Sequence, residues 1–235
     1  MASATENSVP SHSVPSHPVP SNSVPSAAER FVVITGGPGA GKSTLIDRLQ
    51  EAGFARSQEA GRGVIQDQTA VGGRALPWTD PDLFAELMLC WELRSYRDLA
   101  AHAARSVSPG SAASAASAGP DSPSPGPVFF DRGIPDIVGY LRLENRPVPA
   151  HIDTAAREFR YHRRVFIAPP WPEIYRRDAE RRQSLADAER TYASMVTTYT
   201  EYGYELVRLP RVSVAERVRF VTEHLSGPLP VVANR

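Results

Sequence analysis

The chain has very little lysine and cysteine, and it has no excess of charge of either sign. Lys42 is the one lysine among 26 basic residues, so the other 25 (26 minus 1) are arginines. Cys90 stands alone, which excludes an intrachain disulfide and gives no indication of an oxidising compartment. The basic residues are balanced by 26 acidic ones. This balance argues against a general binder of nucleic acid or anionic membranes, which would be strongly basic.

Long apolar runs are also missing, and the first segment has no basic residues. No run of apolar residues approaches the roughly 20 that are needed to cross a bilayer. Residues 1–28 contain no Lys or Arg, so the sequence predicts neither a secretory signal nor a transit peptide there. We therefore expect a cytoplasmic protein that does not interact with membranes or nucleic acid.

Two segments of low complexity divide the chain. Residues 1–28 repeat a Val-Pro-Ser unit, which predicts a disordered tail that could recruit a protein partner. Residues 106–127 are rich in Ser, Ala and Pro and predict a surface insertion. The remainder predicts one domain over 29–227 and a C-terminal tail over 228–235. With 41% apolar residues in the chain, that domain can bury a core.

Short β-branched runs alternate with helical periods over the rest of the sequence. Strands that are separated by helices indicate right-handed βαβ crossovers, and hence a parallel sheet of the α/β class. The predicted strands cover residues 31–35, 54–59, 128–131, 164–168 and 204–209, and the predicted helices cover 42–52, 79–97, 192–202 and 213–225.

Residues 36–44 (GGPGAGKST) match the phosphate-binding pattern G-x-x-x-x-G-K-[ST] between a predicted strand and a predicted helix. The glycines let main-chain N–H groups point inward at a phosphate, and the helix N-terminus adds partial positive charge. We expect Lys42 to reach the β- and γ-phosphates and Ser43 to offer its hydroxyl to Mg²⁺. The predicted nucleotide-binding residues of this loop are Gly36, Gly37, Pro38, Gly39, Ala40, Gly41, Lys42, Ser43 and Thr44.

Asp131 and Arg132 end the predicted strand VFFD and form a second candidate site. An Asp at the C-terminal tip of a parallel strand faces the crevice where ligands bind. There it can hold Mg²⁺ or accept a proton from a substrate hydroxyl. Hydrolytic AAA+ ATPases usually place a Glu at the next position to activate water. Arg132 at that position favours binding of phosphate or substrate over hydrolysis.

Two further features are candidates for the acceptor side of a reaction. Glu59 stands at the end of the second predicted strand and could orient or deprotonate an acceptor, although a solvated loop carboxylate explains it equally well. The segment 173–184 (EIYRRDAERRQS) holds four arginines, among them Arg181. These arginines could close over a phosphate site as a lid. An exposed, salt-bridged helix face is an equal explanation.

In combination, these residues resemble the NadR-like AAA type of small P-loop protein, related to nicotinamide riboside kinase and to nucleoside and nucleotide kinases. The similarity runs from Phe31 to about Leu225 and rests on FVVITGGPGAGKSTLIDRL, FFDRGIPDIVGYL and VFIAPPWPEIYRRDAERRQS. It implies a three-layer P-loop NTPase sandwich whose five-stranded parallel sheet has the order 2-3-1-4-5, with a helical lid. It also implies that the loop 210–214 lies against the adenine.

The resemblance further implies that Lys42, Ser43 and Thr44 bind triphosphate and Mg²⁺. It makes Asp131 the Walker-B-like carboxylate, Arg132 the kinase-type arginine that binds nucleotide, and Arg181 the lid arginine.

We therefore expect an ATP-binding, Mg²⁺-dependent phosphotransferase that acts on a small nucleoside-like acceptor. The absence of an N-K-x-D motif favours ATP over GTP, and residues 59–74 and 79–97 are expected to form the acceptor pocket. A nucleotide-gated binding protein with little turnover and a simple ATP hydrolase stay open as alternatives. The predicted catalytic residues are Lys42, Asp131, Arg181 and Glu59, and the predicted metal-holding residues are Ser43 and Asp131.

Overall fold

The computed structural model describes residues 27–105, 126–174 and 184–226. The tail expected over 1–28, the insertion expected over 106–127 and the C-terminal tail lie almost wholly outside these ranges. Within them, no helix is long and apolar enough to cross a membrane.

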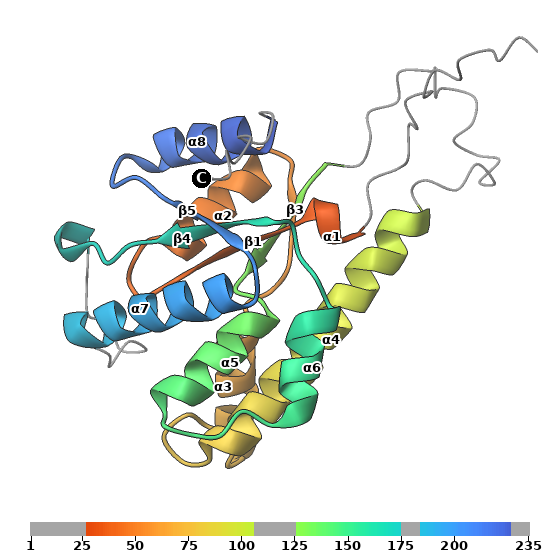
Figure 1. The fold of residues 1–235 in the computed structure, drawn as a ribbon, viewed down its shortest axis with the longest axis vertical. Helices are drawn as coiled ribbons and strands as arrows, with labels where there is room; N and C mark the ends of the chain where they lie inside the picture. The colour runs from red at the N-terminus through yellow and green to blue at the C-terminus, as the bar shows by residue number, and fades with distance from the viewer. Residues whose placement is uncertain (1–26, 106–125, 175–183, 227–235) are drawn as a thin grey trace, which may run out of the picture.

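Five parallel strands form one sheet in the order β2-β3-β1-β4-β5 (Figure 1). The sheet order that the resemblance implied is therefore confirmed. The strands are β1 (Phe31–Gly36), β2 (Ala55–Arg56), β3 (Val128–Asp131), β4 (Arg164–Ala168) and β5 (Glu205–Arg208).

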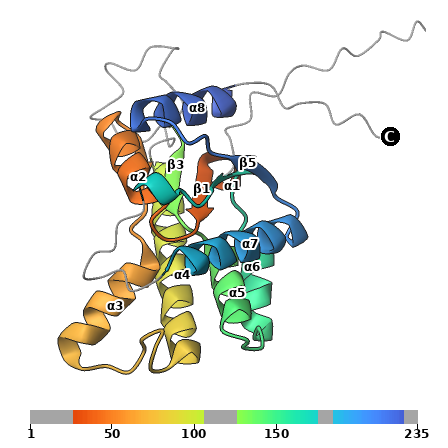
Figure 2. The same cartoon turned by 90° about the vertical axis from the view of Figure 1, so that its left-hand side faces the viewer.

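Helices cover both faces of the sheet and make a three-layer sandwich. The α2 and α8 helices lie on one face, and α7 lies on the other together with α5 and α4 (Figures 1 and 2). The α6 helix packs on α5, and α3 packs on α4. The helices are α1 (Ala27–Arg30), α2 (Lys42–Glu51), α3 (Ala60–Val71), α4 (Pro81–Arg105), α5 (Ile134–Leu143), α6 (Ala150–Glu158), α7 (Leu185–Glu201) and α8 (Val214–Ser226), with a short 3₁₀ turn η1 (Pro172–Ile174).

The central strand β1 contributes to two separate cores. Phe31 and Val33 pack into the larger core with residues of α4, α5 and α7, whereas Val32 and Ile34 face α2 and α8. Successive side chains of a strand point to opposite faces, and here both faces are covered, so the whole run is apolar. In the register of β1 with β3, Ile34 lies opposite Asp131. This pairing brings the end of β3 next to the loop that follows β1.

The structure contains helices that the sequence did not predict. Four described helices, α1, α3, α5 and α6, are additional, and the strand expected over 54–59 is reduced to the two residues of β2. Two glycines in α3, Gly61 and Gly63, lower its helix propensity and weaken its periodic pattern. Because β2 is an edge strand that pairs with β3 alone, a short ladder is sufficient there.

Candidate functional site

A cavity of about 1400 Å³ opens where the five strands end. Residues that follow each strand line it, including Pro38 after β1, Glu59 after β2, Arg132 after β3, Trp171 after β4 and Val212 after β5. In parallel α/β sheets this carboxyl edge is where ligands bind. The structure therefore brings most of the predicted site residues to one place.

The predicted phosphate loop curls at the edge of this cavity. Residues 38–44 line the cavity, and Gly39 and Gly41 have positive φ angles of 71° and 76°. Gly36 has a φ of 126°, and a Cβ at this position would lie 2.3 Å from the carbonyl oxygen of Ala168. Glycine is therefore required at Gly36 both by the backbone conformation and by the close approach of β4.

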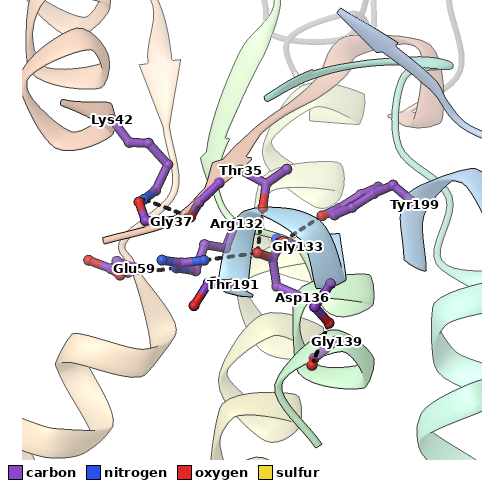
Figure 3. A network of polar contacts seen from close by, with 12 residues as sticks. Thr35, Gly37, Lys42, Glu59, Arg132, Gly133, Asp136, Gly139, Thr191 and Tyr199 are labelled. Atoms are coloured by element: carbon purple, nitrogen blue, oxygen red, sulfur yellow. Dashed lines mark hydrogen bonds and ion pairs between the residues drawn. The ribbon is translucent and has the colours of Figure 1, made fainter. Parts of the chain in front are cut away.

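Lys42 is held inside the loop. The residue is 6% exposed, and Nζ donates hydrogen bonds to the carbonyl oxygens of Gly37, at 2.8 Å, and Gly36, at 3.1 Å (Figure 3). Burial and, after it, the charge of Arg132 lower the pKa of Lys42 to about 8. A polyanion bound in the loop would favour the protonated ammonium. The position of Lys42 thus suits a lysine whose ammonium binds phosphate groups.

Arg132 lies between two carboxylates, which Figure 3 shows on either side of its guanidinium. Nη1 donates to Asp136 at 3.0 Å, and Nε donates to Glu59 at 3.4 Å. Burial alone would lower the pKa of Arg132, but the surrounding carboxylates, Asp136 first, raise it above its ordinary value. Its φ of 72° is in the left-handed region, which costs about 1–2 kcal/mol for a residue with a Cβ. The surrounding contacts must offset this strain.

Asp136, in the first turn of α5, is a site residue that the sequence did not predict. It is 6% exposed and accepts four hydrogen bonds through its two carboxylate oxygens. The donors belong to β1, to the loop after β3 and to α7, so Asp136 ties the orientation of Arg132 to three parts of the fold. They are the Thr35 hydroxyl at 2.5 Å, the Tyr199 hydroxyl at 2.6 Å, and Arg132 Nη1 and the Gly133 N–H at 3.0 Å each.

The two predicted acids, Glu59 and Asp131, lie in different environments. Glu59 borders the cavity and also pairs with Arg62 at 3.7 Å. Burial raises the pKa of Glu59, but Arg132 and the other nearby cations lower it by a larger amount. The pKa of Glu59 is therefore below its ordinary value. Asp131 is 5% exposed, and its Oδ1 has no hydrogen-bond partner. Burial and then the charge of Glu59 raise its pKa to about 6.

The cavity has two ends on either side of the phosphate loop. One end includes the loop after β5, which the resemblance placed against an adenine. The other is formed by α3 and α4, the expected acceptor segments, and by α5, which was not expected. The first end is lined by Trp171, Ile174, Val212, Ser213, Val214 and Arg217, and the second by Arg62, Ile65, Trp78, Phe84, Met88, Glu92, Ile137 and Tyr140, among others.

Arg217, on α8, supports the phosphate loop from the first end. It is 2% exposed, and it donates from Nη1 to the carbonyl oxygen of Ala40 at 2.9 Å and from Nε to that of Pro210 at 2.8 Å. Its guanidinium lies 4.5 Å from the centre of the Trp171 ring. Its buried Nη2 has no hydrogen-bond partner among the described residues, and burial lowers the pKa of Arg217. An anion or a polar ligand group is therefore favoured next to it.

A comparison with protein families matches residues 31–217 to a family described as an AAA domain. The chain belongs to the AAA domain family. Among curated proteins, no sequence matches this chain.

Solved structures share the fold of this AAA domain. One is deoxyadenosine kinase from M. mycoides with dCMP and a flexible dCDP bound, with a TM-score of 0.55 and 15% identity over 83% of this chain and 98% of that chain. Another is NadR protein in complex with NR, with a TM-score of 0.56 and 17% identity over 88% of this chain and 54% of that chain. The chain thus spans about half the length of that NadR chain. Both likenesses show a common fold.

The residues predicted to hold a metal fit a hydrated divalent cation. Ser43 of the AAA domain lines the cavity, and the buried Oδ1 of Asp131 lacks a partner. In the part of the chain that the structure describes, no three His, Cys, Asp or Glu side chains form a metal-binding group. Mg²⁺ is usually held by one or two protein oxygens together with water and substrate phosphates. The donor set is therefore sufficient for Mg²⁺ that arrives with a nucleotide.

The predicted lid arginine, Arg181, lies outside the described residues, as does most of the segment 173–184. The residues that flank the gap are placed. Ile174 precedes it, Asp187 and Arg190 follow it, and all three line the cavity of the AAA domain. The lid therefore stays a prediction.

Proposed function

We propose that this protein is an ATP-dependent phosphotransferase that acts on a hydroxyl group of a small nucleoside-like acceptor. The observation that carries this proposal is the single cavity that joins the phosphate loop to the pair formed by Arg132 and Glu59. A drug-sized ligand occupies a pocket of about 300–1000 Å³, so a cavity of about 1400 Å³ has room for two substrates. The fold shared with a deoxyadenosine kinase and with NadR supports a nucleoside-like acceptor.

Each group would have a separate task in the transfer. The loop N–H groups and Lys42 bind the β- and γ-phosphates, and Arg132 stabilises the charge of the transferred phosphoryl group. Ser43 and Asp131 would hold Mg²⁺, which neutralises phosphate charge when bound. The acceptor oxygen forms a bond to the γ-phosphorus and gives its proton to a carboxylate. The bond from the γ-phosphorus to the bridging oxygen breaks, and ADP leaves.

Two carboxylates compete for the role of proton acceptor. The raised pKa of Asp131 makes it the stronger base, whereas the ion pairs of Glu59 make that group the weaker one. However, Glu59 borders the cavity next to Arg132, and reach comes before pKa in the choice of a general base. We therefore propose that Glu59 accepts the proton of the acceptor hydroxyl and that Asp131 helps to hold Mg²⁺.

Transfer of radiolabelled γ-phosphate from ATP to a panel of nucleosides and pyridine ribosides tests the proposal. We expect a phosphorylated acceptor to form in the presence of Mg²⁺. Rapid release of free phosphate without an acceptor would instead identify a hydrolase. Nucleotide-dependent capture of a protein partner without turnover would identify a nucleotide-gated binding protein.

The raised pKa of Asp131 leads to a pH dependence of Mg²⁺ binding. A carboxyl group with a pKa of about 6 is mostly protonated at pH 5 and mostly ionised at pH 7, and only the ionised form binds the cation well. We expect the complex with a non-hydrolysable ATP analogue to bind Mg²⁺ about tenfold more weakly at pH 5 than at pH 7, beyond the change that the free analogue shows. Calorimetric titration measures this difference. In Asp131→Asn this additional loss of Mg²⁺ affinity at pH 5 should disappear. If it persisted, Asp131 would not be the group that holds the metal.

A further inference from the structure

Glu92, on α4, is a buried acid without a partner at the wall of the cavity. It borders the cavity but is 2% exposed, and its Oε2 has no hydrogen-bond partner. No described residue forms an ion pair or a hydrogen bond with this side chain. Buried polar groups are normally hydrogen-bonded, and one that is not destabilises the folded state. The structure thus contains an acid whose partner must come from outside the described residues.

The position of Glu92 on its helix directs it to the acceptor end of the cavity. Phe84, Met88 and Glu92 are spaced by four residues, and all three border the cavity. Residues at this spacing lie on one face of a helix. An apolar residue in place of Glu92 would continue the apolar stripe formed by Phe84 and Met88, and its burial would leave no polar group without a partner. The acid interrupts an otherwise apolar wall, which is the arrangement of a polar group that orients a ligand.

The charges around Glu92 restrict the kind of group that can satisfy it. The guanidinium of Arg132 already serves Glu59 and Asp136. Burial raises the pKa of Glu92 well above its ordinary value, and the neighbouring carboxylates, Asp136 first, raise it further. Both effects favour the neutral form of Glu92, so the neighbouring carboxylates, and not Glu92 itself, would repel a phosphate or carboxylate of a ligand here. A hydroxyl, amino or amide group would provide the missing hydrogen bond.

We propose that Glu92 is a specificity-determining residue that forms a hydrogen bond with a hydroxyl or amino group of the acceptor. The carboxylates that surround Glu92 disfavour acceptors that carry an anionic group at this point. This inference rests on the proposed phosphotransferase function and narrows its acceptor class. Acceptors are uncharged or cationic compounds such as free nucleosides, and nucleoside 5′-monophosphates are excluded.

The first test is the stability of the full chain without ligand. Glu92→Met continues the apolar stripe with a side chain of similar size, so it should raise the Tm of the free protein by about 2–6 °C. Glu86→Gln is the matched control, because Glu86 lies on the same helix, is not part of the cavity wall and pairs with His151. Its Tm should change by less than about 2 °C. A fall in the Tm of both Glu92→Met and Glu92→Gln would show a structural role and would overturn the proposal.

The second test is transfer of labelled phosphate from ATP to adenosine, deoxyadenosine, cytidine and their 5′-monophosphates. The wild type should phosphorylate at least one nucleoside and none of the monophosphates. Glu92→Met should lower kcat/KM for that nucleoside by about 100-fold while its affinity for a non-hydrolysable ATP analogue stays within twofold. Glu92→Gln, which keeps one oxygen and two N–H donors, should lose about tenfold, mainly through a higher KM. Activity of Glu92→Met within threefold of the wild type, or a preference of the wild type for monophosphates, would overturn the proposal.

A third measurement distinguishes failure of this inference from failure of the proposed function. If the wild type transfers phosphate to none of these compounds, the proposed function fails for this panel. The Tm increase caused by each nucleoside in the presence of the ATP analogue then decides the role of Glu92. An increase in the wild type that is lost in Glu92→Met supports acceptor binding by Glu92. Equal increases in both proteins, or none in either, would overturn it.

Discussion

Replacing Lys42 with alanine is expected to weaken ATP binding and to lower kcat/KM for phosphoryl transfer by at least about 100-fold. The ammonium is the one lysine charge in the chain, and the loop carbonyls of Gly36 and Gly37 hold it at the cavity. Its pKa of about 8 shows that burial works against the charged form in the free protein. A bound polyphosphate would supply the missing opposite charge. The fold should survive, because Leu45, Ile46 and Leu49 keep α2 packed on the sheet.

Calorimetry with ATP and Mg²⁺, together with circular dichroism, measures the effect of Lys42→Ala. Arg48→Ala is a suitable control, because Arg48 lies on the same helix but is exposed and pairs with Glu51. It should bind ATP as the wild type does. Lys42→Arg should also be impaired, since a planar guanidinium does not fit a buried position shaped for an ammonium. Unchanged ATP affinity in Lys42→Ala would mean that the nucleotide binds elsewhere.

The strands of this fold were predictable where burial on both faces makes the sequence apolar throughout. The runs FVVIT, VFFD and RVFIA predicted β1, β3 and β4 to within one residue. The order of the strands came from the resemblance, since strand patterns alone do not specify which strands are neighbours. The helix α3 escaped prediction because its two glycines weaken the helical signal, and tertiary packing on α4 overrides that weakness.

The site was predictable only where its determinants are contiguous in the sequence. The whole phosphate loop lies within residues 36–44, so its pattern is visible there. By contrast, the hydrogen bond from Thr35 to Asp136 spans 101 residues, and that from Arg217 to Ala40 spans 177. Glu59 and Arg132 were each expected at the site, but their pairing across 73 residues was not. An acid such as Asp136 or Glu92 has no local pattern that distinguishes it from the other acids of the chain.

Asp136→Asn should destabilise the protein and slow transfer at the same time. Each of the two carboxylate oxygens of Asp136 accepts two hydrogen bonds, whereas the amide nitrogen of asparagine accepts none. Whichever way the amide lies, two donors lose their acceptor, and the pair with Arg132 loses its charge. Breaking a buried ion pair costs about 3–5 kcal/mol. For a domain of this size we expect a fall in Tm of about 10 °C.

Asp153→Asn separates the effect of burial from the effect of the partners. Asp153 also accepts hydrogen bonds from a tyrosine, Tyr202, and from an arginine, Arg157, but its side chain is 38% exposed. Its substitution should cost about 1 kcal/mol or less and leave transfer unchanged.

In Asp136→Asn, kcat should fall more than ATP affinity, because Arg132 loses its orientation toward the transferred phosphoryl group while the phosphate loop stays intact. If ATP affinity fell as far as kcat, Asp136 would instead support the loop, and its link to Arg132 would be incidental.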